Sequence, residues 1–386
     1  IGEESMDYRL EQRAKVCVSH DFSKDLLETL KTSNYKKPLI SIDSFLLQSP
    51  VVNKALDTLK QADINYVVYD EIVPEPPFEI VNKGAELYQE NECDSIIAIG
   101  GGSVIDASRG INIVSHCGGQ IQEYIEDKTI NQRILGLIAV PTTSGTGSEL
   151  SNALVVTDTK KQEKLAVLSD EAVSEYVILV PELAKSMPKG LTISTGLDVF
   201  AHAMEAYTSN LSTPVVNAVC EKIMFLVFKY LPTAVHHGED LDARERMMVA
   251  AALGGWAINN GGTHLGHSIG HVVGAKYHLA HGNACAYALP GVIEKTALAE
   301  PKKITEIGNI LELSLPNDLS NEELGKKVAK GFKHFRDEVL GLEPCKLNKE
   351  EVVSLTDQVV HERFAANAPF EVTHEIVGAI LESYGG

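Results

Sequence analysis

The segment from about residue 37 to residue 180 alternates short, β-branched apolar runs with stretches of helical periodicity, and this alternation constrains the fold most strongly. The apolar runs are PLISID, NYVVYD, SIIAIG and ILGLIAVP, and helical stretches such as EIVNKGAELYQE lie between them. Strands that alternate with helices of this length form βαβ units, whose strands lie parallel in one sheet. The sequence therefore predicts an α/β domain built on a parallel sheet.

The pattern changes after Pro181, where most segments have helical periodicity and are rich in Ala, Leu and Met. Pro214 predicts the start of a helix through EKIMFLVFKYL, and a further helix is expected from Arg244 up to a pair of glycines. A chain of 386 residues exceeds the size at which single cores stop growing, roughly 250–300 residues. We therefore predict an α/β domain over residues 1–183 and an all-helical domain over residues 184–386.

Composition excludes several classes of function. Hydrophobic residues make up 44% of the chain, and no run approaches the roughly 18 apolar residues of a membrane span. The formal charge of −19 opposes binding to nucleic acid, because the phosphates would be repelled. The six cysteines are scattered without a CxxC pair, and no secretory signal is visible at the N-terminus. We expect a cytoplasmic protein without nucleic-acid or membrane partners, and we assign no cysteine a redox or ligand role.

A glycine-rich loop follows the run SIIAIG. Gly101 and Gly102 precede a predicted helix, with Ser103 as its expected N-cap and Asp106 three residues further on, as in a capping box. Glycines let the backbone approach an anion closely, and the free N–H groups of a helix N-terminus attract phosphate. A single loop of this kind is a weak signal, because a plain tight turn has the same composition.

A second loop, PTTSGTGSE, follows the run ILGLIAVP and contains Thr142, Thr143 and Thr146. Hydroxyl-rich loops are usually turns, but two such loops at strand ends of one sheet predict a dinucleotide site in a Rossmann-like domain. Asp43 ends the run PLISID, where its carboxylate would accept hydrogen bonds from a ribose and repel a 2′-phosphate. This favours NAD over NADP, with a helix cap as the alternative role for Asp43.

The strongest chemical signal lies in GLDVFAHAMEAY and THLGHSIGHVVGAKYHLAHGNA. On a helix, Asp198 and His202 lie one turn apart at i and i+4, so both can bind a single ion. His267 and His271 repeat this spacing, and His281 follows in a predicted loop. A lone histidine is most often a surface or satisfied core residue, but a carboxylate with several imidazoles predicts a divalent metal site.

The donor set does not name the metal. Three imidazoles and a carboxylate suit Fe(II), Zn(II), Co(II) or Mn(II), and affinity alone would favour zinc over iron. In catalysis such a metal acts as a Lewis acid toward an alcohol or an aldehyde carbonyl.

From about Tyr35 to the C-terminus, the sequence resembles the iron-containing (group III) alcohol dehydrogenase family. The matching motifs are IAIGGGSVIDAS (97–108), VPTTSGTGSE (140–149), GLDVFAHAMEAY (196–207) and GHSIGHVVGAKYHLAHGNA (266–284). The resemblance implies an N-terminal dinucleotide-binding domain and an all-α metal-binding domain, in a dehydroquinate synthase-like fold. It also implies NAD(H), a divalent metal that is Fe(II) with Zn(II) as the alternative, a small alcohol or aldehyde substrate, and a homodimer.

The resemblance assigns roles to individual residues. His271 corresponds to an active-site histidine that relays the alcohol proton. The implied metal ligands are Asp198, His202, His267 and His281. The implied cofactor-binding residues are Asp43, Gly101, Gly102, Ser103, Thr142, Thr143, Thr146, Lys164 and Leu179.

The chain departs from the family pattern at three places. VCVSHDFSKD (16–25) lacks the glycines of an FGxG-like turn, which puts cofactor contacts from that region in doubt. Arg109 stands where a lysine is common, and Val180 where an aspartate often precedes the PE pair. None of these positions belongs to the predicted metal site.

Several alternatives remain open. SDEAVSEYVILVPE and NAPFEVTHEIV are similar to segments of 4-hydroxybutyrate dehydrogenases, so the substrate is either a neutral alcohol or a small ω-hydroxy acid, and the acid would need a cation near the site. A dehydroquinate synthase-like lyase would need several Lys or Arg side chains between residues 190 and 290, where they are few. A zinc enzyme of the glycerol dehydrogenase kind and a non-catalytic nucleotide-binding scaffold are the remaining alternatives.

Overall fold

The computed structural model describes residues 11–161 and 163–386. Their contacts group into two compact units. The sheet unit comprises Arg13–Pro188 and His237–Gly255, and the helical unit comprises Lys189–His236 and Trp256–Gly386, together with the end of the N-terminal segment. Residues 237–255 thus belong to the sheet unit, although they are largely helical, whereas the prediction placed them in the helical domain. The division into domains at residues 183 and 184 stays a prediction.

The sheet unit is built on six parallel strands in the order β1-β8-β5-β4-β2-β3. The predicted parallel sheet is therefore confirmed, and each of the four apolar runs named above contains one of its strands. The strands are β1 (Lys15–Val18), β2 (Pro38–Ile42), β3 (Val67–Tyr69), β4 (Ser95–Gly100), β5 (Leu137–Pro141) and β8 (Tyr176–Leu179).

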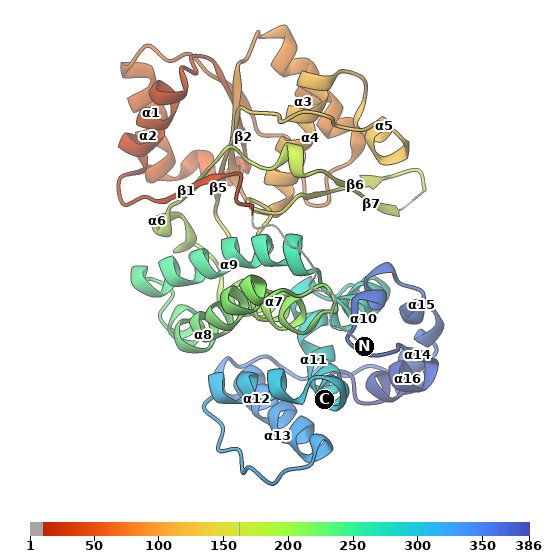
Figure 1. Ribbon diagram of the computed structural model, residues 1–386. Helices are drawn as coiled ribbons and strands as arrows, with labels where there is room; N and C mark the ends of the chain where they lie inside the picture. Colours follow the sequence, from red (N-terminus) through yellow and green to blue (C-terminus); the bar gives the residue numbers. More distant parts are fainter. Residues whose placement is uncertain (1–10, 162) are drawn as a thin grey trace. The chain divides into compact units, whose positions relative to one another are not determined.

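Helices cover both faces of this sheet, as Figure 1 shows. One face packs its alternate strand residues, among them Ile40, Ile97 and Ile138, against α1 (Phe22–Ser33) and α2 (Pro50–Gln61). Successive residues of a strand point to opposite faces, so a strand that is covered on both sides must be apolar throughout. This explains why β2, β4 and β5 are buried along their whole length. The helices α3 (Phe78–Glu90), α4 (Gly102–Cys117) and α5 (Ile121–Glu126) lie on the other side.

An antiparallel hairpin interrupts the βαβ pattern between β5 and β8. Its strands are β6 (Ala153–Asp158) and β7 (Glu163–Leu168), and they form a separate two-stranded sheet. The sequence pattern predicted parallel units up to residue 180 and gave no indication of this hairpin. A short helix, α6 (Pro181–Ala184), follows β8.

The helical unit confirms the change of pattern after Pro181, since every strand of the described residues lies before residue 180. Helix α8 begins at Pro214, as predicted, and the further predicted helix is α9 (Leu241–Gly261), most of which belongs to the sheet unit. The helices are α7 (Lys189–Thr208), α8 (Pro214–His236), α10 (Leu265–Tyr277), α11 (His281–Ala299), α12 (Pro301–Ile310), α13 (Asn321–His334), α14 (Lys349–Val353), α15 (Thr356–Val360) and α16 (His374–Glu382).

Helix α7 is the centre of the helical unit. It packs against α8, α10 and α11, and it is buried on almost every side from Thr192 to Thr208. A helix that is buried all round belongs to a core, and polar side chains on it need partners there. The acidic and histidine residues of α7 are therefore held among packed helices.

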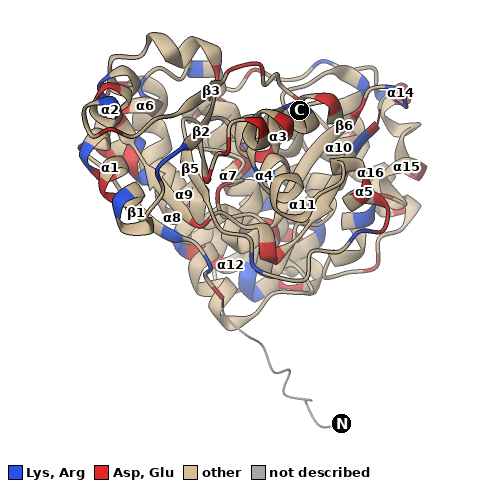
Figure 2. Ribbon diagram, turned by 90° about the horizontal axis from the view of Figure 1, so that it is seen from above, with Lys and Arg blue, Asp and Glu red and all other residues tan. Residues whose placement is uncertain are grey.

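Three further observations bear on the expectations from composition. Figure 2 shows acidic and basic residues interspersed along the elements of the chain. No helix within residues 11–161 and 163–386 is both long and apolar enough to cross a membrane. All six cysteines lie in the described residues and are unpaired.

Candidate metal centre and nucleotide loops

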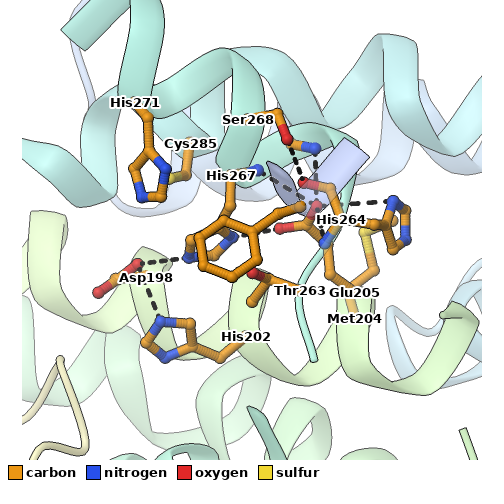
Figure 3. Close-up of polar contacts among 12 residues, drawn as sticks. Asp198, His202, Met204, Glu205, Thr263, His264, His267, Ser268, His271 and Cys285 are labelled. Atoms are coloured by element: carbon orange, nitrogen blue, oxygen red, sulfur yellow. Dashed lines mark hydrogen bonds and ion pairs between the residues drawn. The ribbon is translucent and has the colours of Figure 1, made fainter. Parts of the chain in front are cut away.

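The carboxylate of Asp198 on α7 lies at the centre of the predicted metal ligands. Its Oδ1 atom is 3.5 Å from the Nε2 atom of each of His202, His267 and His281. Figure 3 shows Asp198 facing the rings of His202 and His267. The structure therefore brings all four predicted ligands together.

These residues fit a divalent cation. Asp198 and His267 are buried, and neither Asp198 Oδ1 nor His267 Nε2 has a hydrogen-bond partner among the described residues. Buried polar atoms are nearly always paired, because an unpaired one loses its hydration without compensation. A carboxylate oxygen and imidazole nitrogens that converge without hydrogen bonds are the donor set of a Zn(II) or Fe(II) site.

Three helices each contribute two residues at i and i+4 to this cluster. The pairs are Asp198 and His202 on α7, His267 and His271 on α10, and His281 and Cys285 on α11. The prediction that His281 lies in a loop was wrong, because it is the first residue of α11, after the N-cap Ala280.

A glycine allows α7 and α11 to approach closely enough to form the cluster. A Cβ atom at Gly282 would clash with the carbonyl oxygen of Ser194 and would also contact the side chain of Asp198. Only glycine, which has no Cβ atom, fits where the backbones of two helices come this close. Gly282 therefore keeps His281, its neighbour in the chain, beside Asp198.

Glu205 orients His267, and the sequence analysis missed it. One Glu205 oxygen accepts the Nδ1–H of His267, and the other accepts backbone N–H groups of His264, Gly266 and His267 at 3.2, 2.6 and 3.2 Å. Burial would raise the pKa of Glu205, but His267 holds it below its usual range, at about 2. The hydrogen bond at Nδ1 leaves Nε2 directed at Asp198, which is how buried carboxylates usually prepare a histidine ligand. The sequence did contain a signal for Glu205, because it lies seven residues after Asp198 and therefore on the same face of α7.

His271 lies at the rim of the cluster, with its side chain 37% exposed. Its ring stacks on that of His281 with centroids 5.4 Å apart, and its Nδ1 is 3.3 Å from an oxygen of Glu362. The same carboxylate accepts a hydrogen bond from Ser268 Oγ at 2.6 Å and one from the backbone N–H of Phe364 at 2.9 Å. Nothing in the sequence indicated Glu362, because it follows His271 by 91 residues and lies outside the motifs.

The two predicted phosphate loops lie side by side in the sheet unit, because β4 and β5 are neighbours. The N–H of Thr142 donates to the carbonyl of Gly100 at 3.0 Å. A Cβ atom at Gly101 would lie 3.5 Å from Thr143, and one at Gly102 would lie 2.9 Å from Thr146. The glycines therefore leave room for the threonines of the second loop.

Asp43 contacts the first loop from the end of β2. Its Oδ2 accepts the N–H of Gly101 at 3.3 Å, and burial raises its pKa despite that bond. Asp43 is also the N-cap residue of a short 3-10 helix, Ser44–Gln48, as the alternative role predicted, but its side chain makes no cap bond there.

The expected capping box at Ser103 and Asp106 is wrong. Helix α4 begins at Gly102, with Gly101 as an N-cap that makes no side-chain bond. Ser103 Oγ instead accepts the N–H of Glu75 at 3.3 Å. This leaves the first N–H groups of α4 without a side-chain cap, which is a feature of helix termini that bind phosphate.

Asp106 and Arg109, both on α4, tie the second loop to the helix. Arg109 is fully buried and donates to the carbonyls of Ser148 and Ala153. Asp106 accepts the hydroxyl of Ser148 and the N–H of Val155. A buried charged group needs hydrogen bonds to compensate its lost hydration, and the two carbonyls supply them to Arg109.

Lys164 and Leu179 are the two remaining predicted cofactor residues. Lys164 on β7 is exposed and pairs with Glu75 Oε1 at 2.5 Å, and Glu75 in turn contacts Ser103. Leu179 ends β8 with a side chain that is only 1% exposed. Their cofactor roles stay predictions.

Replacing Gly282 by alanine tests the close approach of α7 and α11. The Gly282→Ala substitution would push α11 away from Ser194, at a cost of about 1–3 kcal/mol in stability. We expect the dissociation constant for Co(II) or Zn(II) to rise roughly 10- to 100-fold, the loss seen when ligand-orienting groups are removed. Metal titration by calorimetry measures this. Gly190→Ala is the matched control, since a Cβ atom there meets nothing within 4 Å. Equal metal affinities in the two variants would contradict the role of Gly282.

Glu149, in the second loop, generates a prediction about pH. It is 2% exposed, and burial raises its pKa from the ordinary 4.5 to about 7 against the opposing charge of Arg109. Between these values the unfolded chain has lost the proton that the folded chain keeps, so stability falls as the pH rises through this window.

The Glu149→Gln substitution should remove that pH dependence. Relative to wild type, the free energy of unfolding of the variant should rise by up to about 3 kcal/mol between about pH 5 and about pH 8. Urea unfolding at both pH values measures the difference. Glu163→Gln, at an exposed carboxylate on β7, is the control. A difference between Glu149→Gln and wild type that does not vary with pH would refute the prediction.

Comparison with known proteins places this geometry in a family. Residues 14–181 match the family model "Iron-containing alcohol dehydrogenase", and residues 192–385 match "Fe-containing alcohol dehydrogenase family, C-terminal". The chain is 35% identical to an NAD-dependent methanol dehydrogenase of Bacillus methanolicus over 75% of its own length and 76% of that protein. It is 34% identical to a 1,3-propanediol dehydrogenase of Citrobacter freundii over 74% of each chain.

A solved structure supports the same assignment. The alcohol dehydrogenase from Oenococcus oeni superposes with a TM-score of 0.90 at 30% identity, covering 98% of this chain and 100% of that one. Sequence and fold agree over nearly the whole chain. The protein belongs to the iron-containing alcohol dehydrogenase family.

Proposed function

We propose that this protein is a metal-dependent, NAD(H)-linked alcohol dehydrogenase that transfers a hydride between a small primary alcohol and nicotinamide, or reduces the aldehyde in the reverse direction. The observation that carries the proposal is the buried Asp198 carboxylate, which faces three imidazole nitrogens without a hydrogen-bond partner at Oδ1. The similarity to NAD-dependent methanol and propanediol dehydrogenases supplies the reaction type.

The metal ligands in this proposal are Asp198, His202, His267 and His281. A divalent metal bound there supplies Lewis acidity, which lowers the pKa of an alcohol or polarises an aldehyde carbonyl. Family membership favours Fe(II), with Zn(II) as the alternative, because the N and O donors suit both. Metal analysis of anaerobically purified protein separates the two.

The chain's own residues prepare this site for proton transfer. Glu205 fixes the ring of His267 through Nδ1, and Glu362 lies beside Nδ1 of His271. A hydrogen bond from Nδ1 to Glu362 leaves Nε2 of His271 free to accept the hydroxyl proton of an alcohol. The partial exposure of His271 then lets that proton pass to solvent. We therefore assign His271 the role of general base in alcohol oxidation and general acid in aldehyde reduction.

The sheet unit holds the cofactor in this proposal, and NAD supplies the hydride acceptor. Gly101, Gly102 and Ser103 line the start of α4, where the backbone N–H groups of Gly102 and Ser103 are available to the pyrophosphate and that of Gly101 is bonded to Asp43. Asp43, beside Gly101, favours a free ribose 2′-hydroxyl and hence NAD. The remaining residues of the proposed cofactor site are Thr142, Thr143, Thr146, Lys164 and Leu179.

The His271→Ala substitution separates catalysis from metal binding. We expect its kcat/KM in steady-state NADH oxidation with short aldehydes and Fe(II)-loaded protein to fall roughly 10²- to 10⁴-fold. Metal content should stay at the wild-type level, because His271 is not a ligand. His236→Ala, at an exposed histidine that ends α8, should keep wild-type activity. Metal-loaded wild-type protein that binds NADH but turns over no short aldehyde would refute the proposed function.

One observation favours a second candidate substrate, a small ω-hydroxy acid such as 4-hydroxybutyrate. A carboxylate substrate needs a cation near the site, and Arg363 offers one. Its guanidinium lies 4.4 Å from the ring centroid of Phe364, and that ring lies 5.6 Å from the ring of His271. The guanidinium is therefore within about 10 Å of the proposed general base, and it is exposed.

The Arg363→Met substitution decides between the two substrate classes. If the substrate is an ω-hydroxy acid, kcat/KM for 4-hydroxybutyrate should fall roughly 10- to 100-fold, because the variant loses a charge-assisted hydrogen bond to the carboxylate. The kcat/KM for 1,4-butanediol, which has no carboxylate, should change little. Steady-state NAD reduction with both substrates measures this, and Arg363→Lys tests whether charge alone suffices. Equal effects on both substrates would exclude the acid.

We also propose a cytoplasmic location and a homodimer. Six unpaired cysteines, among them the exposed Cys17, suit a reducing compartment. The edge strand β1 is largely exposed, and the exposed fraction of Val16 is 43%. An exposed edge strand offers unpaired backbone groups to which another chain can bind. Light scattering on the purified protein gives its oligomeric state.

A further inference from the structure

A thiol lies among the proposed metal ligands. Cys285 follows His281 by one turn on α11 and is fully buried. Its Sγ lies 3.8 Å from His281 Nε2. Donor atoms of Asp198, His267, His281 and Cys285 all lie within 4.8 Å of one another. Figure 3 shows Cys285 beside His267 and His271.

The packing of α10 on α11 brings this thiol to the cluster. A Cβ atom at Gly270 would overlap the Sγ of Cys285 at 2.5 Å and lie tightly against its backbone at 3.1–3.2 Å, so the glycine gives the thiol its space between the two helices. Asp198 Oδ1 and His267 Nε2, on two of the residues that share the group with Cys285, are among the buried atoms of the described residues that have no hydrogen-bond partner. The thiol therefore faces donors that lack a partner, whereas an ordinary core cysteine packs against apolar atoms.

We propose that Cys285 is a further ligand of the divalent metal and binds through its thiolate alongside Asp198, His267 and His281. This inference rests on the metal site of the proposed function. On binding, the S–H bond breaks, the proton leaves to solvent and a sulfur–metal bond forms, with no change in oxidation state. His202 lies outside the group of four, so Cys285 either adds to the four predicted ligands or takes the place of His202.

A thiolate donor changes which metals the site prefers. Thiolates favour Zn(II) and its close analogues Co(II) and Cd(II), whereas carboxylate and imidazole donors alone accommodate Fe(II) and Mn(II). The site would accordingly be more selective for thiophilic metals than its histidines and aspartate indicate.

Cobalt substitution tests the proposal by a signal that is independent of activity. Co(II)-loaded wild-type protein should show visible d–d bands together with a near-ultraviolet thiolate-to-cobalt charge-transfer band. Cys285→Ala should keep the d–d bands and lose the charge-transfer band. Cys220→Ala, at another fully buried cysteine of the helical unit, should keep both.

The outcomes separate the two levels of the argument. Wild-type protein that binds no Co(II) contradicts the metal site itself. Bound Co(II) without a charge-transfer band, or a band that survives in Cys285→Ala, overturns the role of Cys285 and leaves the metal site intact.

If Cys285→Ala does not fold, X-ray absorption of Zn(II)-loaded wild-type protein decides. A sulfur shell at about 2.3 Å supports the proposal, and nitrogen and oxygen shells alone at about 2.0–2.1 Å overturn it.

Discussion

The helical unit is organised around one buried negative charge. Asp198 is 3% exposed on a helix that is itself buried, and its Oδ1 faces three imidazole nitrogens at 3.5 Å. Burial would raise the pKa of this carboxyl group, but the neighbouring histidines hold it below its usual range. A charge in such surroundings is tolerable only when opposite charge or a metal compensates it. The surrounding histidines are thus what allows this core to contain an aspartate.

The packing around that charge follows from the same requirement. Donors from α7, α10 and α11 can converge only if the helices approach closely, and Gly270 and Gly282 provide the space. Glu205 then determines which nitrogen of His267 faces the cluster. A second carboxylate, Glu362, does the same for His271 from a distant part of the chain. Backbone contact and hydrogen-bonded carboxylates therefore orient the rings more strictly than the ligand spacing alone would.

The sheet unit solves a different problem, which is to present uncapped backbone N–H groups to an anion. The strand order places the loops after β2, β4 and β5 next to one another, so Asp43, the glycines and the threonines meet at one edge. Asp106 and the buried Arg109, both on α4, hold the second loop by its backbone and by Ser148. A rigid loop with unused donors loses less entropy when it binds a ligand.

Local periodicity was enough to predict the parallel sheet, the helical second half and a metal site among the aspartate and the histidines, because i and i+4 spacing and strand alternation are properties of short segments. The resemblance to the family singled out Asp198, His202, His267 and His281. It did not predict the β6–β7 hairpin, the start of α11 at His281 or the true N-cap of α4. Those depend on contacts between segments far apart in the chain. The roles of Glu205, Glu362 and Cys285 belong to the same class, because a carboxylate or thiol acquires its function from what tertiary packing places within a few ångströms of it. The sequence by itself thus determined the architecture and the candidate metal ligands, and only the tertiary structure decided which other side chains lie beside them, because those contacts join segments far apart in the chain.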